Sequence, residues 1–384
     1  MRAERIVARG FRNLADLDLP LPPGGAVFLG PNGHGKTNLL ELLYYPVLFR
    51  SVRGARDVEV TRHGESGFQL VLSGAVGQRG SGAAVAQELS VRFRAADRRK
   101  SVLIDGVPPE RLSEAIGHWL AVAFLPTDLR LVQGSALERR QYLDRVLALA
   151  DRRYLRALSR YRRALAHRNA ALRQQRPEVG AAFDEPLATA GTELVQQRLA
   201  WTRQAAGRVA AECDNLGELE PMALGYRGDE SLADLGQWPA ALRRSATRDQ
   251  RLGMTTVGPH RHDLELRLGN RLLREVGSTG QQRTAAVGLK LCERATLAAA
   301  SGGEPALLLD DLFAELDSDR RKRLAARLAT RESGAGAGDE AGRAPQTFIT
   351  SPRDDELPEC FHLELLSVKA GRAQALSGFQ RRVA

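Results

Sequence analysis

The residues with the clearest chemical pattern are Gly30 to Thr37, which read Gly-Pro-Asn-Gly-His-Gly-Lys-Thr. They match the phosphate-loop pattern Gly-x4-Gly-Lys-Ser/Thr without a mismatch. In such a loop the glycines let successive backbone N–H groups curve around a phosphate, the lysine reaches the β- and γ-phosphates, and the last hydroxyl binds Mg2+. The sequence therefore predicts a nucleotide site made by Gly30, Pro31, Asn32, Gly33, His34, Gly35, Lys36 and Thr37.

The flanking residues favour this interpretation over a glycine turn that precedes a lysine by chance. Residues 25–29 form a short apolar run of the kind found in buried strands. Residues 38–44 contain good helix formers, with leucines at helical spacing. A strand, a glycine turn and a helix in this order are the context that a phosphate loop requires.

A carboxylate-bearing segment near the other end of the chain completes the pattern of an ATP site. Residues 306–309 are purely apolar and lead into Asp310 and Asp311. We expect Asp310 to hold Mg2+, directly or through water, and Asp311 to orient or deprotonate the attacking water. An Asp-Asp pair after an apolar strand could equally cap a helix, but the phosphate loop favours the catalytic interpretation.

A third segment, Ser278-Thr279-Gly280-Gln281, opens a predicted helix. A Ser-x-Gly turn at a helix N-terminus offers backbone N–H groups and the positive end of the helix dipole to an anion. Many helices begin in this way, so the segment gains meaning only together with the phosphate loop and Asp310.

The elements that must position these residues change in kind along the chain, from a β-rich beginning to a helical middle and then a mixture. Predicted strands cover residues 6–11, 16–21, 68–75, 89–94, 102–106, 223–226, 264–268, 306–309 and 347–350. Predicted helices cover residues 136–173, 187–213, 284–300 and 320–330. The first two helices are expected to form an antiparallel pair. Residues 77–84 and 333–344, rich in glycine and alanine, are expected to be loops.

The positive charge of the chain has two possible explanations, nucleic-acid binding and a codon bias. The formal charge is +10 over 384 residues, a length that allows two to three domains, and only five of the 56 basic residues are lysines. Arginine suits phosphate backbones, but the codon preference of a GC-rich genome would give the same bias. The arginines on the predicted helix 136–173 could follow DNA or form a solvated face. They are Arg152, Arg153, Arg156, Arg160, Arg162, Arg163 and Arg168.

Other features narrow the class of protein. Cys213, Cys292 and Cys360 lie too far apart for a metal or redox motif, which suits a reducing cytosol. No signal-peptide core and no run of about 18 apolar residues occurs, so we expect a cytoplasmic protein without a membrane segment. His260 and His262 lack a further metal ligand, so a structural turn is favoured over a metal site.

The order of these motifs resembles that of SMC-type ATP-binding-cassette heads, and within that group it is similar to the RecF family of bacterial DNA replication and repair proteins. The motifs that carry the resemblance are spread over nearly the whole chain in the family's order. They are residues 10–13 (Gly-Phe-Arg-Asn), 30–41, 125–135, 139–144, 156–161, 168–170, 257–261, 278–283 and 310–317.

This resemblance implies an α/β fold, namely an ABC-type P-loop ATPase head with an inserted, mainly helical second lobe. Residues 1–124 and 300–384 would form the ATP-binding head, and residues 125–299 the lobe that carries the signature motif. In such heads ATP is held between two protomers, so the site would be shared.

The resemblance also implies roles for individual residues. Lys36 and Thr37 of one protomer would hold ATP while Ser278 and Gly280 of the other cap its γ-phosphate. Arg12 follows a phenylalanine as in SMC-type heads and would touch the nucleotide. The expected catalytic residues are Lys36, Asp311 and Ser278, the nucleotide-binding residues outside the loop are Arg12, Ser278, Gly280 and Gln281, and the Mg2+ ligands are Thr37 and Asp310.

Proteins of the RecF family bind double-stranded DNA when loaded with ATP, and act with RecO and RecR to load RecA at single-stranded gaps. The resemblance therefore implies a weak, DNA-stimulated ATPase that forms an ATP-dependent homodimer on double-stranded or gapped DNA, with RecR- and RecO-type mediators and RecA as partners. Two other functions stay open. One is a structural SMC-like DNA clamp, which the missing long coiled coil disfavours, and the other is a transporter-type ABC ATPase subunit, which the basic charge disfavours.

Three positions depart from transporter-type cassettes. Asp311 stands where those cassettes use glutamate, and its shorter side chain suggests slow hydrolysis. Thr350 stands near the place where a switch histidine would be expected. The Q-loop glutamine of those cassettes, which faces Mg2+, has no secure counterpart here. Three residues are candidates for its position: Gln133, Thr127 and Asp128.

Overall fold

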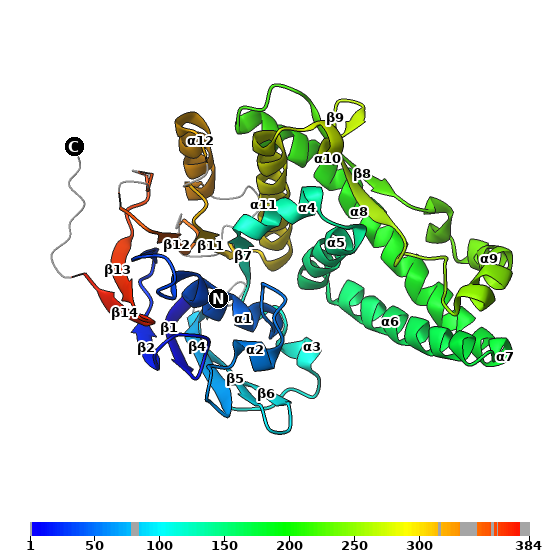
Figure 1. Cartoon of the computed structure of the whole chain (residues 1–384), viewed down its shortest axis with the longest axis horizontal. Coiled ribbons are helices and arrows are strands. Elements are labelled where there is room, and N and C mark those ends of the chain that lie inside the picture. The colour runs from blue at the N-terminus through cyan, green and yellow to red at the C-terminus, as the bar shows by residue number, and fades with distance from the viewer. Residues whose placement is uncertain are drawn as a thin grey trace. The chain divides into compact units, whose positions relative to one another are not determined.

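The computed structural model describes residues 2–77, 84–313, 316–330, 344–354, 357–358 and 360–376. The chain forms two compact units (Figure 1): unit 1 is Met1–Thr127 with Leu297–Ala384, and unit 2 is Asp128–Thr296. The motif residue Glu315 and most of the two expected loops, residues 78–83 and 333–343, lie outside the described residues.

The larger sheet of unit 1 has the strand order β14-β13-β3-β12-β11-β7. Its strands are β3 (Gly25–Leu29), β7 (Ala121–Phe124), β11 (Ala306–Asp310), β12 (Thr347–Ser351), β13 (Glu364–Lys369) and β14 (Arg372–Ala375). All neighbours from β13 to β7 pair in parallel, and β14 pairs antiparallel at the edge. Parallel pairing places the carboxyl ends of β3, β11 and β12 at one edge of the sheet, where α/β proteins bind ligands.

A second sheet of unit 1 is antiparallel, with the order β2-β1-β4-β5-β6. Its strands are β1 (Arg2–Arg9), β2 (Leu17–Pro20), β4 (Gly67–Gly77), β5 (Ala84–Arg94) and β6 (Arg99–Ile104). The helices of unit 1 are α1 (Lys36–Leu48), α2 (Asp57–Val60), α3 (Leu112–Ala115) and α12 (Ser318–Ala329). The rings of Phe11, Tyr45 and Phe68 meet edge to face, with centroids 5.3 to 6.0 Å apart, and so join α1 to this sheet.

Unit 2 is mainly helical and includes a small antiparallel sheet of order β10-β9-β8. Its longer helices are α5 (Ala136–Ala150), α6 (Arg152–Arg173), α8 (Asp184–Asn215), α9 (Trp238–Leu252) and α11 (Thr279–Ser301), the last of which ends in unit 1. The shorter elements are α4 (Arg130–Gln133), α7 (Pro177–Ala181), α10 (Leu273–Val276), β8 (Met222–Arg227), β9 (Asp263–Leu268) and β10 (Arg271–Leu272).

Helices α6 and α8 form the expected antiparallel pair. Arg168 contacts Asp184 at one end, Arg160 contacts Glu193, and Tyr154 contacts Arg198 at the other end. Residue numbers therefore fall along α6 as they rise along α8. The predicted helix 136–173 is two helices, because Asp151 leaves the helical conformation and caps α6, its side chain accepting a hydrogen bond from the N–H of Arg153.

A buried polar network holds unit 2 together near the middle of α8. The guanidinium of Arg198, which is 2% exposed, donates to Asp144 at 2.6 Å, to the hydroxyl of Tyr154 at 2.9 Å and to the carbonyl of Pro259 at 2.6 Å. Buried ionic groups need such complete hydrogen bonding, since each loses its hydration. The network therefore fixes the turn that begins at Gly258 against the helices.

His260 and His262 belong to this structural turn. His260 contacts the Tyr161 hydroxyl at 2.6 Å and the Thr255 carbonyl at 2.9 Å. His262 contacts the Tyr226 hydroxyl at 2.7 Å and accepts from the N–H of Asp229 at 3.2 Å. Burial lowers the pKa of each ring to about 4, so both are neutral near pH 7. All four ring nitrogens thus have protein partners.

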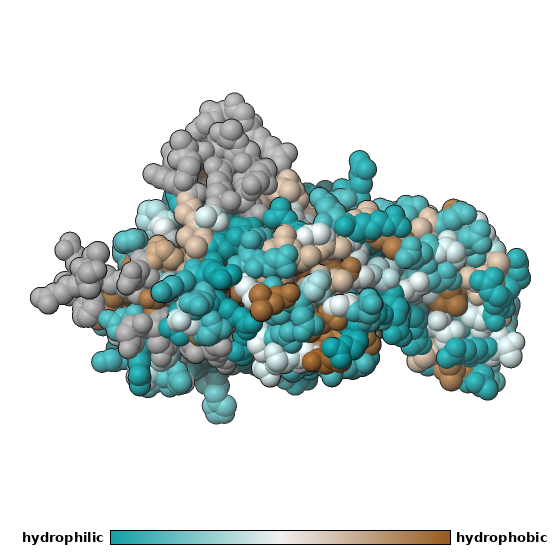
Figure 2. Space-filling model, turned by 90° about the horizontal axis from the view of Figure 1, so that it is seen from above, coloured by the Kyte–Doolittle hydropathy of each residue, from teal (hydrophilic) through white to brown (hydrophobic). Residues whose placement is uncertain are grey.

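Among the described residues, no helix has the length and apolar character needed to cross a bilayer. On the face shown in Figure 2, apolar residues form small separate patches among hydrophilic ones. Such scattered apolar residues are usual on protein surfaces.

Candidate nucleotide site

The predicted phosphate loop connects β3 to α1 at the carboxyl edge of the parallel sheet, and α1 begins at Lys36. Gly33 and Gly35 have φ values of 81° and 106°, a left-handed conformation that favours glycine. A Cβ atom on Gly30 would lie 2.2 Å from the carbonyl oxygen of Val368. The glycines are therefore required by backbone geometry as well as by room for a phosphate.

Lys36 is folded back over its own loop. Its Nζ donates to the carbonyls of Gly30 at 2.6 Å and Pro31 at 3.1 Å and to the side chain of Asn32 at 3.3 Å, and the residue is only 4% exposed. An ammonium held at the mouth of a loop of backbone N–H groups can exchange these oxygens for phosphate oxygens without moving far.

Thr37 and Asp310 meet at the position that the sequence assigns to Mg2+. The Thr37 hydroxyl donates to Oδ1 of Asp310 at 2.9 Å, and the hydroxyl of Thr350 donates to the same oxygen at 2.8 Å. Asp310 is 6% exposed at the end of β11. A set of hydroxyl and carboxylate oxygens fits Mg2+, a hard cation that prefers oxygen ligands.

Asp311 directly follows Asp310 in the sequence and lies in a sharp turn. Its φ is +46°, which is uncommon for a residue other than glycine, and its N–H donates to the hydroxyl of Thr350 at 2.9 Å. The side chain is half-buried. Residues held in left-handed conformations often lie at functional sites, and Thr350 ties this one to Asp310.

Arg12 takes part in a charged cluster beside the loop. Its guanidinium donates to both carboxylate oxygens of Glu41, at 2.8 and 3.0 Å, and to the carbonyl of Glu59 at 2.8 Å. Glu41 lies on α1 with a fully buried side chain, and it also accepts from Arg53 and Ser51. In this structure Arg12 holds Glu41, and its contact with a nucleotide stays a prediction.

The charge of Glu41 is maintained by this cluster. Burial would raise the pKa of the carboxyl, but hydrogen bonds from Arg12, Arg53 and Ser51 outweigh that effect, and the pKa lies below its usual value. The link to the loop is direct, because Arg53 also donates to Asn38, the residue after Thr37.

The turn between β13 and β14 supports the phosphate loop from the other side. The N–H of Gly371 donates to the carbonyl of His34 at 2.9 Å, and the N–H of Ala370 donates to the His34 ring at 3.1 Å. A Cβ on Gly371 would lie 2.2 Å from the carbonyl oxygen of Asn13. Close backbone approach, and hence glycine, is required here.

The signature residues form the start of α11 in unit 2. The N–H of Ser278 donates to the Gln281 side chain at 3.0 Å, and the N–H of Gln281 donates to the Ser278 hydroxyl at 3.2 Å. This reciprocal pair is a capping box. Ser278 is exposed and Gly280 half-buried, so the turn lies at the surface of unit 2, where an anion can reach the start of the helix.

Comparison with known proteins gives the family. The "DNA replication and repair protein RecF" of Anaeromyxobacter sp. (strain Fw109-5) is 38% identical over 340 residues, covering 86% of this chain and 89% of the relative. The chain belongs to the RecF family. The protein of the same name from Myxococcus xanthus (strain DK1622) is 35% identical over 348 residues, covering 87% of this chain and 89% of that one. No protein-family model matches the chain.

Solved structures agree with the RecF assignment. A "recombination mediator protein RecF-ATP in RecFOR pathway" has a TM-score of 0.84 at 26% identity, with 98% of each chain covered. The Smc head domain of Pyrococcus furiosus has a TM-score of 0.54 at 15% identity, covers 98% of this chain and 96% of its own, and so shares the fold alone. The expected α/β fold of an ABC-type ATPase and the resemblance to RecF are confirmed.

The structure also places Gln133 and the arginines of α6 in this RecF-family chain. Gln133, a candidate for the residue that faces Mg2+, donates to the side chain of Gln282 at 2.7 Å, next to the signature turn. Of the arginines on α6, Arg160 pairs with Glu193 and Arg162 with Asp144. Arg168 is buried and does not belong to an exposed face. Four others are exposed and have no carboxylate partner among the described residues: Arg152, Arg153, Arg156 and Arg163.

Proposed function

We propose that this RecF-family chain is an ATP-dependent DNA-binding protein of recombinational repair and replication restart. The observation that carries the proposal is the meeting of Lys36, Thr37 and Asp310 at one edge of the parallel sheet of unit 1. A buried ammonium, a hydroxyl and a carboxylate beside a glycine loop are the groups that a Mg2+-bound triphosphate requires.

In the proposed site, Lys36 exchanges the carbonyls of its own loop for β- and γ-phosphate oxygens. Thr37 and Asp310 would hold Mg2+, which when bound would offset part of the phosphate charge. The carboxylate of Asp311 orients the attacking water and accepts its proton, and the shorter aspartate gives slow turnover. Thr350 keeps the Asp310 carboxylate and the Asp311 backbone in place through its hydrogen bonds.

The proposed active form is an ATP-dependent homodimer. The head, residues 1–124 and 300–384, binds the nucleotide of one protomer, and the lobe, residues 125–299, brings the signature of the other. The Ser278 hydroxyl and the Gly280 N–H then add donors to the γ-phosphate. Dimerisation thereby depends on the presence of a γ-phosphate.

The loaded dimer binds double-stranded DNA near single-stranded gaps and, together with RecO- and RecR-type mediators, helps to load the recombinase RecA in the cytoplasm. DNA stimulates its weak ATPase, and hydrolysis releases the dimer. Relatives described as DNA replication and repair proteins, and a solved relative described as a recombination mediator with ATP, support this role. The exposed arginines of α6 suit a phosphate backbone.

Binding to double-stranded, single-stranded and gapped DNA with and without ATP tests the proposal. We expect duplex-containing DNA to be bound at least about tenfold more tightly with ATP than without it, with little binding to single strands. Fluorescence anisotropy with labelled oligonucleotides measures this, and Lys36→Ala is the matched control that should lose the ATP effect. DNA binding that ATP leaves unchanged would contradict the proposal.

A further inference from the structure

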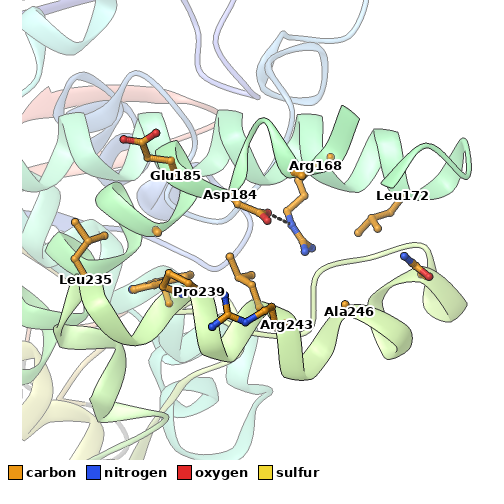
Figure 3. A pocket seen from close by; sticks show the side chains of 14 residues that line it. Arg168, Leu172, Asp184, Glu185, Leu235, Pro239, Arg243 and Ala246 are labelled. Carbon is orange, nitrogen blue, oxygen red and sulfur yellow. Dashed lines mark hydrogen bonds and ion pairs between the residues drawn. The ribbon is translucent and has the colours of Figure 1, made fainter. Parts of the chain in front are cut away.

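Unit 2 contains a cavity of about 530 Å³ that plays no part in the proposed ATP chemistry. It lies between α9 on one side and α6, α7 and the start of α8 on the other (Figure 3). Its walls are mainly apolar and include Leu172, Ala188, Trp238, Pro239, Leu242 and Ala246. The indole N–H of Trp238 donates to the carbonyl of Leu232 at 3.0 Å, so its polar atom is satisfied away from any ligand.

One of the two arginines in the walls is paired with carboxylates. The guanidinium of Arg168 reaches into the space between the helices and pairs with Asp184 and with the buried Asp249, each at 2.8 Å. The carboxylate of Glu185 points away from the α9 wall (Figure 3). Glu185 and Arg243 are both exposed and have no ion-pair partner among the described residues, and Arg243, on α9, is the cation of the two.

Helix α9 is strongly basic. Arg243, Arg244, Arg248 and Arg251 are all exposed, and none has a carboxylate partner within the part of the chain that the structure describes. Helical spacing places Arg243 on the same face as the wall residue Ala246, whereas the other three lie on the opposite face of α9. One arginine is thus positioned for contact, and the others add a positive field over about a Debye length.

We propose that this cavity binds a bulky apolar side chain from an acidic peptide segment of a partner protein. The volume lies within the range of ligand pockets, and an apolar anchor in a pocket is the usual centre of a protein interface. A carboxylate next to that anchor would pair with Arg243. A phosphate would not be stable against these apolar walls. The inference is independent of the proposed ATPase function.

A labelled, end-blocked hexapeptide with two central leucines between pairs of glutamates is the probe. We expect saturable binding by fluorescence anisotropy, with Kd on the order of 10 to 100 μM at 0.1 M salt. Ala246→Trp, which fills the cavity, should weaken binding at least about thirtyfold. Arg243→Glu should weaken it about tenfold, while the matched charge change Arg244→Glu on the far face should cost less than about threefold.

Thermal unfolding of each variant shows whether it is folded, and ATP binding by unit 1 should be unchanged in all three. Two control peptides complete the test: lysines in place of the glutamates, and serines in place of the leucines, each of which should bind at least about tenfold more weakly. Equal binding of the lysine peptide, or unchanged binding to Ala246→Trp, would overturn the proposal. So would a single-stranded oligonucleotide that binds wild type and is lost in Ala246→Trp, because the cavity would then hold a base.

Discussion

The phosphate loop of unit 1 and the signature turn of unit 2 both present N–H groups at the start of a helix, but they are built differently. The loop has a buried ammonium, Lys36, and a carboxylate, Asp310, within one hydrogen-bonded set of elements. The turn of residues 278–281 contains no charged residue. The side chains of Ser278 and Gln281 each accept from the other residue's backbone N–H, and the Gln281 amide also donates to Glu218. A helix start with a cation and a carboxylate can hold a nucleotide alone, whereas an uncharged one can only add to a nucleotide held elsewhere.

The largest effect should come from Lys36. We expect Lys36→Ala and Lys36→Met to weaken ATP binding at least about a hundredfold, and so to remove dimer formation, because this ammonium is the charged group of the loop. Isothermal titration with ATP and sedimentation velocity with and without ATP measure the two effects. A variant that still dimerises normally with ATP would refute the role given to Lys36.

Ser278→Arg should separate the two halves of the comparison. A bulky side chain at the signature turn should block closure on the partner's nucleotide while leaving the variant's own phosphate loop intact. ATP affinity of the monomer should therefore change less than about threefold, while ATP-driven dimerisation, DNA binding and turnover fail together. Titration calorimetry, sedimentation and a phosphate-release assay measure these quantities.

A mixture of Ser278→Arg with Lys36→Ala tests the shared site directly. A mixed dimer contains one composite site in which an intact loop faces an intact signature. Partial turnover in the mixture, absent from either variant alone, is the expected outcome. Full activity of Ser278→Arg alone would mean that the two-protomer site is wrong.

Asp311→Asn should affect hydrolysis alone. Asparagine tolerates the left-handed φ of +46° and fills similar space, but an amide cannot accept the proton of the attacking water. Turnover should fall on the order of a hundredfold, with ATP affinity nearly unchanged and the dimer longer-lived on DNA. Single-turnover hydrolysis is the measurement, with Asp311→Glu as the control that keeps a carboxylate. Unchanged turnover would assign the water to another residue.

The parts of the nucleotide site in unit 1 differ in how far the sequence predicts them. The phosphate loop and the Asp310 strand are local patterns, and the structure has a strand, a glycine turn and a helix where residues 25–44 indicate them. The supports of the loop are not local: Gly371 binds His34 across more than 300 residues of sequence. The role of Thr350 likewise comes only from the pairing of β11 with β12. No spacing along one chain encodes such contacts.

The pattern of charged residues in the sequence was the least reliable basis for predicting which side chains are exposed and where helices lie. Arg168 has the same helical context as its exposed neighbours, yet it is buried because Asp184 and Asp249 come to it from other helices. Helix α9 was not expected at all, since its arginines obscure an apolar face that includes Trp238 and Leu242. For Arg168, tertiary partners decide whether the side chain is solvated, and a single sequence does not contain that information.

Glu41→Gln should lower the stability of unit 1 more than it lowers the affinity for ATP. The substitution removes the charge that Arg12 and Arg53 share and leaves two cations around a neutral amide. We expect a loss of roughly 2 to 4 kcal/mol in the free energy of unfolding, and less than about tenfold in ATP affinity. Urea unfolding and calorimetry measure these. Glu59→Gln, which removes an exposed carboxylate of the same region, is the control, and an equal effect of both would contradict a special role for Glu41.

The smallest predicted effect is a loss of stability of unit 2 as the pH falls. The folded pKa of His260 and of His262 is about 4, against about 6.5 for an unperturbed ring. Between these values the unfolded chain binds more protons, so stability falls as the pH falls from about 6.5 towards 4. From pH 7 to 5.5 the loss should be about 1 kcal/mol per histidine. Hydrogen exchange of β8 and β9 at the two pH values measures it, and replacing both histidines by glutamine should flatten the dependence. An equal acid response of the unit 1 sheet would show that these rings are not its cause.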